Sequence, residues 1–461
     1  MLLANVVRDE TRLPKTSLPY DKNDGAMKLL REDGKLMATM LSTRADYNEL
    51  VQDHRVSGRV YYDPAVFEEE LEKIWYRDWI YVAHESEIPE PGDYVTRRIG
   101  LQPVIVSRDE DRAVHLLLNR CMHRGNTVCQ SERGNSHAFR CAYHGWTYDN
   151  RGALVGVPYA AGYDGSFRRE QYPLARVPRM AAYRGLIFGS MSPAGPSLEE
   201  RLGKAAGLID QFVDLSPEGQ VVLRAGVLKH SFKGNWKMAL ENSVDGYHPN
   251  ILHHAAMMLI TKGRKVDMES VFGEHTDALA RDLGSGSAQL DLTPVNRERG
   301  GRVVPHGWSA EAWRQYLDAM EGRYGADRAH EIIEIGGPHF CTFPNIIFIL
   351  NQFRIIQPVS VNETVVYYYP TMLKGAPEEM NQRRLAETYL IHGPAGRVAP
   401  DDFEAYERNQ EGFHARVNEW LVLRRGLHRE QRERSGTVAG HETDETTQRG
   451  IWRHYREVMQ S

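Results

Sequence analysis

Two short cysteine–histidine pairs are the residues of this sequence best suited to hold a metal centre. One residue separates Cys121 from His123, two residues separate Cys141 from His144, and seventeen residues lie between the pairs. Thiolate and imidazole are ligands for zinc and for iron–sulfur clusters. Two such pairs on glycine-containing loops therefore predict one inorganic centre held between two loops, either a structural zinc ion or an iron–sulfur cluster.

The order of the ligand types favours one of these alternatives. Structural zinc sites usually place two cysteines or two histidines close together, whereas here each pair is mixed. In a Rieske cluster, two cysteines hold one iron and two histidines hold the other. Two loops that each give one ligand to each iron fit that arrangement. The spacing therefore favours a Rieske cluster, with zinc as the alternative.

A second candidate metal site lies in the segment ENSVDGYHPNILHH, residues 241–254. His248 and His253 are five residues apart, about 140° around a regular helix, so a shared ligand face requires a break in the helix. Pro249 supplies a reason for that break. Two imidazoles and one carboxylate form the facial triad of non-haem Fe(II) oxygenases. The alternative is a polar cluster with a structural role, and the spacing makes His254 the weaker candidate ligand.

The two motifs together resemble those of the Rieske non-haem iron aromatic-ring-hydroxylating oxygenases, large (alpha) subunit. The first is C-x-H-x17-C-x2-H followed by Gly145 and Trp146, and the second is E-N-x2-D-x-Y-H-x4-H. The resemblance covers roughly residues 58–425, although one residue fewer than in some members separates Asn242 from Asp245. It implies a 2Fe-2S cluster and a mononuclear Fe(II), held respectively by Cys121, His123, Cys141 and His144 and by His248 and His253.

The resemblance also assigns two carboxylates. In the family the third iron ligand lies far downstream, after a glycine- and proline-rich loop, and the segment GPAGRVAPDDF matches that placement. Asp402 is the predicted ligand and Asp401 the alternative, although a pair of aspartates is also common at a helix N-terminus. Asp245 matches the residue that connects the two metal centres. It would accept hydrogen bonds from His248 and from the cluster histidine His144 of a neighbouring copy of the chain.

What the resemblance implies for function is a terminal oxygenase component that uses O2 and electrons relayed from NAD(P)H. The chain has no second cysteine cluster and no G-x-G-x-x-G after a predicted strand, so a separate reductase, with or without a ferredoxin, must supply the electrons. The expected reaction is cis-dihydroxylation of an aromatic acid or a related arene. The alternatives are a Rieske monooxygenase or demethylase acting on a non-aromatic substrate, and a non-enzymatic Rieske or zinc protein. In the family, domains of neighbouring subunits pair head to tail, so the resemblance implies a homotrimer, with or without small beta subunits.

The elements around these residues predict an α+β chain with two folded domains. Residues 58–191 read as a small all-β Rieske domain, because short strands alternate with tight turns. Residues 192–461 read as a larger α+β catalytic domain, with an antiparallel sheet flanked by helices in a helix-grip-like arrangement. Residues 1–57 are an N-terminal extension expected to pack on the catalytic domain or on a neighbour. The sequence predicts an irregular loop over residues 263–310 and a mobile segment over residues 432–450.

The substrate pocket is only weakly indicated. Phe343, Ile347, Phe348 and Phe353 are candidates to line an apolar cavity, although such residues on strands are more often core. Arg302 or Arg354 are candidates to pair with a substrate carboxylate, although structural or solvated arginines are more common.

Composition limits the class of protein. At 461 residues the chain should form two or three domains, and its formal net charge of −5 gives no basic surface for nucleic acid. No apolar run reaches the roughly 18–20 residues needed to cross a bilayer, and the N-terminus does not read as a signal peptide. Four cysteines do not make a disulfide framework, so we expect a cytoplasmic protein. Cys129 and Cys341 lack ligand spacing and are expected to be small buried side chains.

Overall fold

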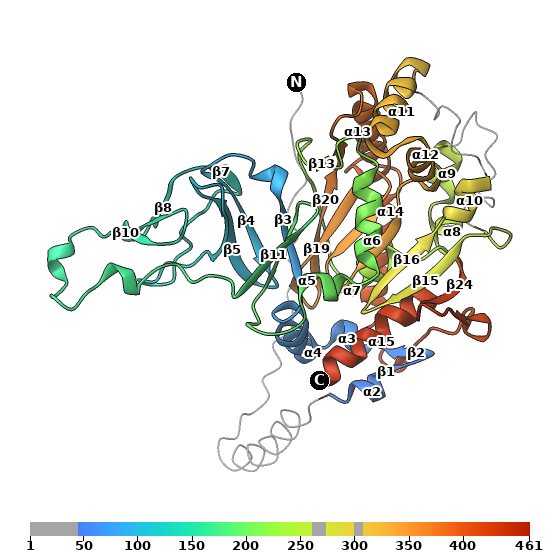
Figure 1. The fold of residues 1–461 in the computed structure, drawn as a ribbon. Coiled ribbons are helices and arrows are strands. Elements are labelled where there is room, and N and C mark those ends of the chain that lie inside the picture. Colours follow the sequence, from blue (N-terminus) through green and yellow to red (C-terminus); the bar gives the residue numbers. More distant parts are fainter. Residues whose placement is uncertain (1–44, 261–272, 299–307) are drawn as a thin grey trace, which may run out of the picture. The chain divides into compact units, whose positions relative to one another are not determined.

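Antiparallel sheets and the helices packed on them make up residues 45–260, 273–298 and 308–461, which the computed structural model describes (Figure 1). The predicted α+β class is therefore confirmed. Most of the predicted N-terminal extension, residues 1–44, lies outside the described residues. Within the described ranges, no helix is both long and apolar enough to cross a membrane.

The first described residues pack against the C-terminal part of the chain. The strand β2 (Arg55–Ser57) pairs antiparallel with β22 (Trp420–Val422), and the amide of Tyr47 donates to the side-chain oxygen of Gln460 at 3.1 Å. The helices and the other strand of this region are α2 (Tyr47–Leu50), β1 (Val51–Gln52), α3 (Arg59–Tyr62) and α4 (Pro64–Glu70). Asp63 caps α4, because its side chain accepts a hydrogen bond from the amide of Ala65 at 2.9 Å.

Three small antiparallel sheets carry the two cysteine–histidine loops. Their strand orders are β6-β5-β4-β7, β10-β9-β8 and β11-β12-β3 (Figure 1). The strands are β3 (Ile80–His84), β4 (Asp93–Ile99), β5 (Gln102–Arg108), β6 (Val114–Leu118), β7 (Arg133–Asn135), β8 (Ala138–Arg140), β9 (Thr147–Asp149), β10 (Leu154–Gly156), β11 (Arg179–Tyr183) and β12 (Leu186–Ser190). The loop between β6 and β7 contains the first pair, and the loop between β8 and β9 contains the second.

A long antiparallel sheet forms most of the remaining described chain. Its order is β14-β20-β19-β18-β17-β16-β15-β24-β23. The strands are β14 (Leu228–Phe232), β15 (Leu279–Gly284), β16 (Ser287–Asp291), β17 (His339–Thr342), β18 (Ile346–Ile349), β19 (Gln352–Ser360), β20 (Glu363–Pro370), β23 (Gln431–Arg432) and β24 (Val438–His441). On β19, Arg354 is in register with Ile347 of β18 and with Tyr368 of β20. Cross-strand partners share a face of a sheet, so these three side chains lie on one face. Phe353, which precedes Arg354 on β19, lies on the other face.

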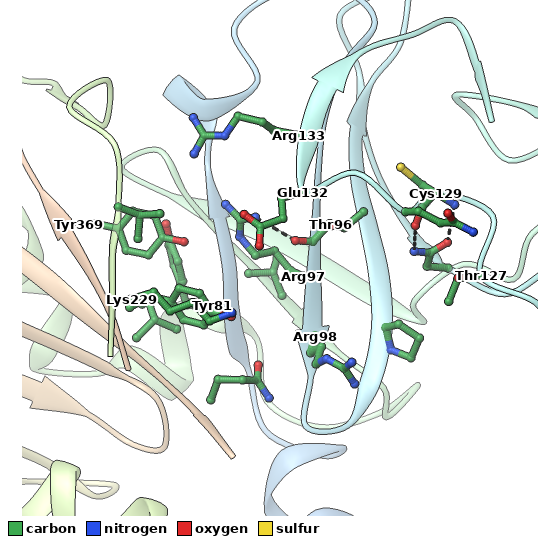
Figure 2. A pocket seen from close by; sticks show the side chains of 18 residues that line it. Tyr81, Thr96, Arg97, Arg98, Thr127, Cys129, Glu132, Arg133, Lys229 and Tyr369 are labelled. Carbon is green, nitrogen blue, oxygen red and sulfur yellow. Dashed lines mark hydrogen bonds between the residues drawn. The ribbon is translucent and has the colours of Figure 1, made fainter. Parts of the chain in front are cut away.

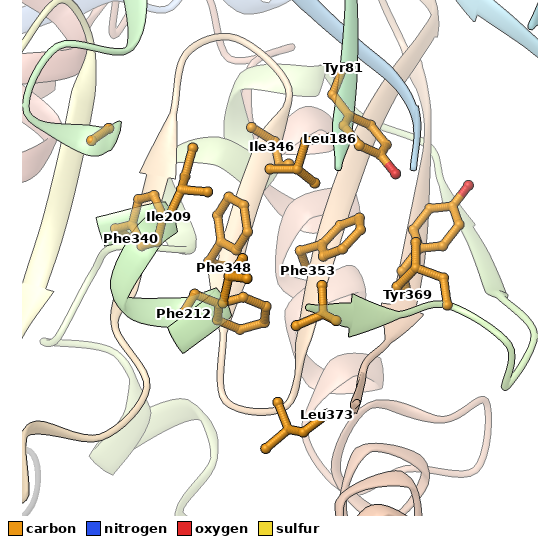
Figure 3. Packing of buried hydrophobic residues seen from close by; sticks show 14 of the residues in the cluster. Tyr81, Leu186, Ile209, Phe212, Phe340, Ile346, Phe348, Phe353, Tyr369 and Leu373 are labelled. Carbon is orange, nitrogen blue, oxygen red and sulfur yellow. The ribbon is translucent and has the colours of Figure 1, made fainter. Parts of the chain in front are cut away.

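The Phe353 face of this sheet carries the main hydrophobic core (Figure 3). Phe340, Phe348 and Phe353 form a row across three strands, and the rings of Phe340 and Phe348 are stacked with centroids 4.5 Å apart. The helices that contribute to this core include α6 (Ala205–Asp214), α11 (Ala310–Tyr324) and α12 (Ala326–Ile335). Full burial of one such side chain stabilises the fold by about 1.5–3 kcal/mol. Phe348 and Phe353 are therefore core residues.

Four helices on or beside the long sheet complete this part of the fold. On the face that bears Arg354, α7 contacts β19 and α14 contacts β14, while α13 contacts β20 and α15 contacts β15 and β16. Their bounds are α7 (Trp236–Asn242), α13 (Glu378–His392), α14 (Ala399–Gly412) and α15 (Thr446–Gln460). His248 and His253 lie shortly after the end of α7, and the aspartate pair lies in the first turn of α14. The sheet thus brings together segments about 150 residues apart, since Asp401 and His253 are 148 positions apart in sequence.

Two sequence-based predictions of irregular structure are wrong for the described residues. Residues 263–310 contain the hairpin β15–β16, followed by α10 (Thr293–Glu298), and residues 261–272 and 299–307 lie outside the described part. Residues 432–450 contain β24 and the start of α15, and Thr446 and Thr447 have no exposed surface. In both stretches, pairing with distant strands orders a polar sequence that has little hydrophobic pattern of its own.

A polar pocket of about 420 Å³ lies where β4 and β5 meet β19 and β20 (Figure 2). Arg97 lines it and pairs with Glu87 at 2.6 Å. The side-chain amide of Gln357, on β19, donates to the carbonyl of Gly100 at 2.6 Å. The Gln357 contact joins the long sheet to the turn between β4 and β5, whereas the Arg97–Glu87 pair lies within the first part of the chain.

Candidate functional site

The two cysteine–histidine loops have the same backbone geometry. The amide of Gly125 donates to the carbonyl of Cys121 at 2.9 Å, and the amide of Gly145 donates to the carbonyl of Cys141 at the same distance. Each cysteine amide also donates to a carbonyl five residues later, at 2.8 Å in both loops. The two glycines have φ values of 73° and 71°, a conformation that costs little only for glycine. The glycine four residues after each cysteine therefore allows the loop to fold back over its ligand.

The predicted cluster ligands divide into a buried pair and a more accessible pair. Cys121 and Cys141 are only 3% and 2% exposed, whereas His123 is half-buried and His144 is exposed. The imidazole rings of His123 and His144 have centroids 4.4 Å apart, and His123 stacks on Trp146 at 5.0 Å. The histidine end of the site thus faces the surface, where another protein can approach it.

The surroundings of the cysteines suit a Rieske cluster. The hydroxyl of Tyr148 lies 3.4 Å from Sγ of Cys121, and the side-chain amide of Asn126 lies 3.9 Å from Sγ of Cys141. Polar groups at this range tune the potential of an iron–sulfur cluster. All four cysteines of the chain are free, so neither predicted ligand is used in a disulfide.

The half-buried cluster histidine also fits. Nδ1 of His123 is buried without a hydrogen-bond partner. Burial, and then the charge of nearby His144, lower the pKa of His123. A neutral imidazole with a free nitrogen is the form that binds a metal. The four residues therefore fit a 2Fe-2S group.

Three elements bring the second site together. The helix α7 ends at Asn242, and a one-turn helix, α8 (Pro249–Leu252), follows it. His248 precedes α8 as its N-cap, and His253 follows as its C-cap, so the two imidazoles flank a single turn that begins at a proline. This is the break that the five-residue spacing requires. Asp402 projects from the first turn of α14.

His248, His253 and Asp402 converge so that one ligand atom from each lies within 4.8 Å of the others. Oδ1 of Asp402 is 3.1 Å from Nε2 of His253 and 3.7 Å from Nε2 of His248. Such atoms bind metals at about 2.0–2.2 Å, which separates ligands at right angles by about 3 Å. Asp402 is buried, and its Oδ1 has no hydrogen-bond partner. The donor set and its spacing fit a divalent iron with a two-histidine, one-carboxylate ligand set.

The neighbouring aspartate lies on the other edge of the same imidazole. Oδ2 of Asp401 is 3.4 Å from Nδ1 of His253, and the Asp401 side chain is 42% exposed. Burial lowers the pKa of His253, but the nearby carboxylates of Asp402 and Asp401 outweigh this effect and leave the pKa raised. The two aspartates thus contact opposite nitrogens of the His253 ring. Of the two, Asp402 is the one that also lies near Nε2 of His248.

Asp245 is close to the other metal-site histidine. Its Oδ2 lies 3.5 Å from Nδ1 of His248, and its Oδ1 accepts a hydrogen bond from the amide of Tyr247 at 2.7 Å. Asp245 and His248 both line a cavity of about 560 Å³ that also borders α14. His254, by contrast, is exposed at the start of α9 (His254–Ile260) and does not join the cluster.

Glu241, the first residue of the segment that carries the metal-site histidines, is a buried carboxylate to which the motif assigned no role. Glu241 accepts hydrogen bonds from the hydroxyl of Tyr61 at 2.5 Å and from the indole of Trp452 at 3.0 Å. Burial, with a smaller contribution from the charge of Asp245, raises the pKa of Glu241 to about 7, although its hydrogen bonds to Tyr61 and Trp452 and the charge of Lys237 lower it. In the sequence it appears only as the first residue of the E-N-x2-D motif, within α7. Its two hydrogen-bond donors, Tyr61 and Trp452, come from distant parts of the chain.

The remaining candidates divide as follows. Cys129 and Cys341 are buried, as predicted. Arg354 is also buried, on the sheet face that bears α7, and Arg302 lies outside the described residues.

Comparison with known families matches both metal-bearing regions. Residues 78–175 match the Rieske 2Fe-2S domain, and residues 214–461 match the ring hydroxylating alpha subunit (catalytic domain). The catalytic match alone covers more than half of the chain.

Curated proteins and solved structures agree with these matches. The chain is 35% identical over 382 residues to toluate 1,2-dioxygenase subunit alpha of Pseudomonas putida, covering 80% of each chain. It is 32% identical over 388 residues to the anthranilate 1,2-dioxygenase large subunit of Acinetobacter baylyi, covering 81% of each. The crystal structure of naphthalene 1,2-dioxygenase from Rhodococcus sp. bound to indole superposes with a TM-score of 0.75 at 26% identity, covering 88% of this chain and 94% of that one. With two metal sites of matching chemistry and homology over most of its length, the chain belongs to the Rieske non-haem iron, ring-hydroxylating oxygenase alpha subunits.

Proposed function

We propose that this chain is the terminal oxygenase subunit for cis-dihydroxylation of an aromatic acid. The observation that carries the proposal is the convergence of His248, His253 and Asp402. Relatives named for toluate, anthranilate and 2-halobenzoate support an aromatic carboxylate as the substrate, and relatives named for naphthalene and biphenyl support the wider class of arenes.

Each residue of the second site has a separate role in this proposal. His248, His253 and Asp402 hold the iron, and Asp402 offsets part of its charge. Asp401 accepts a hydrogen bond from Nδ1 of His253, which fixes the orientation and tautomer of that ring. The carboxylate of Asp245 lies 3.5 Å from Nδ1 of His248, where its charge favours a proton on that nitrogen and leaves Nε2 for the iron. When bound, Fe(II) supplies O2 activation, and the 2Fe-2S cluster on Cys121, His123, Cys141 and His144 supplies one-electron transfer.

The electrons must reach this chain from outside. Dihydroxylation consumes O2, two electrons and two protons, and the electrons come from NAD(P)H through a separate reductase, with or without a ferredoxin. The exposed edge of His144 is where such a transfer can enter or leave. We propose that His144 also meets Asp245 of a neighbouring copy, which requires a ring of subunits. A homotrimer, with or without small beta subunits, closes such a ring.

We also propose the limits of the domains. A Rieske domain over residues 58–191 and a catalytic domain over residues 192–461 place each metal site in its own unit, and residues 1–57 form an extension. The matched family regions, 78–175 and 214–461, lie inside these limits. A cytoplasmic location is consistent with four cysteines that are all free.

The test is product formation under 18O2 with the purified protein, a surrogate reductase and ferredoxin, and benzoate as substrate. We expect a cis-diol with both oxygen atoms labelled, coupled to NAD(P)H oxidation. A product with one labelled oxygen would instead establish monooxygenation. No oxygenated product from any aromatic acid or hydrocarbon, with both iron sites loaded, would refute the proposal.

A further inference from the structure

Arg354 is a buried cation without a counter-ion in the described part of the chain. Its exposed fraction is 5%, and no described carboxylate lies within 4.0 Å of its guanidinium. Its Nε is buried without a hydrogen-bond partner. A guanidinium has five N–H donors and stays protonated in proteins, so burial of its charge is unfavourable unless an anion pairs with it. Such an anion is missing from this chain's described residues.

The contacts of Arg354 hold the guanidinium in place without neutralising it. Nη2 of Arg354 lies 2.6 Å from Nε2 of His392, and the guanidinium lies 4.8 Å from the ring centroid of Tyr368. The side-chain amide of Gln352 lies 2.7 Å from the other nitrogen of His392. Burial first, and then the charge of Arg354, lower the pKa of His392 well below its usual range. His392 is therefore neutral and accepts the N–H of Arg354.

This group faces the side of the sheet on which the metal histidines lie. His339 lies on the same face of the sheet as Arg354, and its Nε2 is 2.6 Å from the carbonyl of Ser243, at the end of α7. Burial, the charge of Arg354 and the charge of His248 all lower the pKa of His339. The guanidinium is thus within electrostatic range of the metal-site segment. Its hydrogen bond goes to His392, however, and not to the carboxylates of that site.

We propose that Arg354 binds the carboxylate of the aromatic acid substrate, and this inference rests on the proposed function. The planar fork of the guanidinium matches a carboxylate with two parallel hydrogen bonds. One face of the guanidinium lies against Tyr368, and His392 holds one of its five donors, so the fork is positioned before substrate arrives. The substrate then supplies the missing anion. A neutral arene leaves the charge unpaired, so Arg354 selects acids over hydrocarbons.

The experiment compares benzoate with toluene, which has a methyl group in place of the carboxylate. Dissociation constants are measured by equilibrium dialysis on the purified holoenzyme, and kcat and KM by product formation. Arg354→Gln should weaken benzoate binding by about 10–150-fold, the usual effect of losing hydrogen bonds to a charged group. Toluene binding should change by less than about 3-fold. Arg354→Lys keeps the charge but loses the fork, so its benzoate affinity should lie between those of wild type and Arg354→Gln.

Arg384→Gln is a matched control for the loss of a buried guanidinium. Arg384, on α13, is 7% exposed, its Nε has no partner, and its Nη2 donates to Thr371 at 3.1 Å. It lies beside Tyr316 of the main core, away from the metal residues. We expect the Arg384→Gln variant to be less stable than wild type in urea unfolding and to keep the wild-type preference for benzoate over toluene.

Several results would overturn the inference. One is benzoate binding by Arg354→Gln within about 3-fold of wild type, and another is an equal loss for benzoate and toluene. If Arg354→Gln does not fold, unchanged benzoate affinity in Arg354→Lys would overturn it. A wild type that oxidises toluene but does not bind benzoate would refute the role of Arg354 alone. A wild type that oxidises neither, nor any other arene, would refute the proposed function.

Discussion

Asp402→Ala should abolish binding of the mononuclear iron, whereas Asp401→Ala should only weaken it. Asp402 is buried, and its Oδ1 lies 3.1 Å and 3.7 Å from the Nε2 atoms of His253 and His248. Asp401 is 42% exposed and contacts the opposite nitrogen of His253 at 3.4 Å. Loss of a carboxylate that orients a ligating histidine typically costs 10–100-fold in metal affinity, so we expect about that range for Asp401→Ala. Loss of Asp402 removes a ligand and should cost more.

The assay is total iron and acid-labile sulfide per chain after gel filtration in the presence of a mild chelator. Wild type should hold about three iron atoms per chain, of which two belong to the cluster. Asp402→Ala should hold about two and form no product. Asp401→Ala should fall between these values and regain activity as Fe(II) is added. The cluster absorption spectrum and the sulfide content serve as controls and should match wild type in both variants.

The opposite order of iron loss would refute the reasoning. If Asp401→Ala lost the third iron while Asp402→Ala retained it, the exposed carboxylate would be the ligand, and the geometry around Nε2 would have no bearing on metal binding. Equal loss in both variants, without recovery of Asp401→Ala by added Fe(II), would show that the two aspartates act as a unit.

Three further predictions concern other parts of the molecule. Asp245→Ala should keep the cluster spectrum and nearly abolish product formation, and turnover at the wild-type rate would exclude the role proposed for it. Lys237→Met leaves the fully buried carboxylate of Glu70 without its cation, so urea unfolding should show a loss of about 3–5 kcal/mol that Glu70→Gln largely restores in the double variant. Burial, and then the charge of Arg201, lower the pKa of His454 to about 3 in the folded protein, against 6.5 when unfolded. Stability from His454 is thus present above pH 6.5 and lost as the pH falls, so wild type should lose about 2 kcal/mol more than His454→Gln between pH 6.5 and 4.5 in urea titrations. An identical dependence of the unfolding free energy on pH in the two proteins would contradict this prediction.

The two metal motifs were readable because their chemistry is local. The cysteine–histidine loops need only a few residues and a glycine at positive φ, so spacing and residue type carry the signal. The separation of His248 and His253, with a proline between them, in the same way predicts a helix break, and the structure places a one-turn helix there. The start of α4 is equally local, because the cap at Asp63 and the proline at N1 act on neighbouring amides.

Long-range contacts decided what the sequence alone left open. The sequence offered both Asp401 and Asp402 as ligands, and only the packing of α14 beside His248 and His253 shows which carboxylate is buried at their shared edge. Arg354 was one of two candidate arginines in the sequence, and its burial without a described anion depends on strand register and on α13. Residues 279–291 and 438–441 became strands because partner strands satisfy their backbone groups. Local sequence determines which chemistry is available, because capping, turns and ligand spacing act over a few residues. Tertiary structure determines which side chains meet, because burial and strand pairing depend on residues that are distant in the chain.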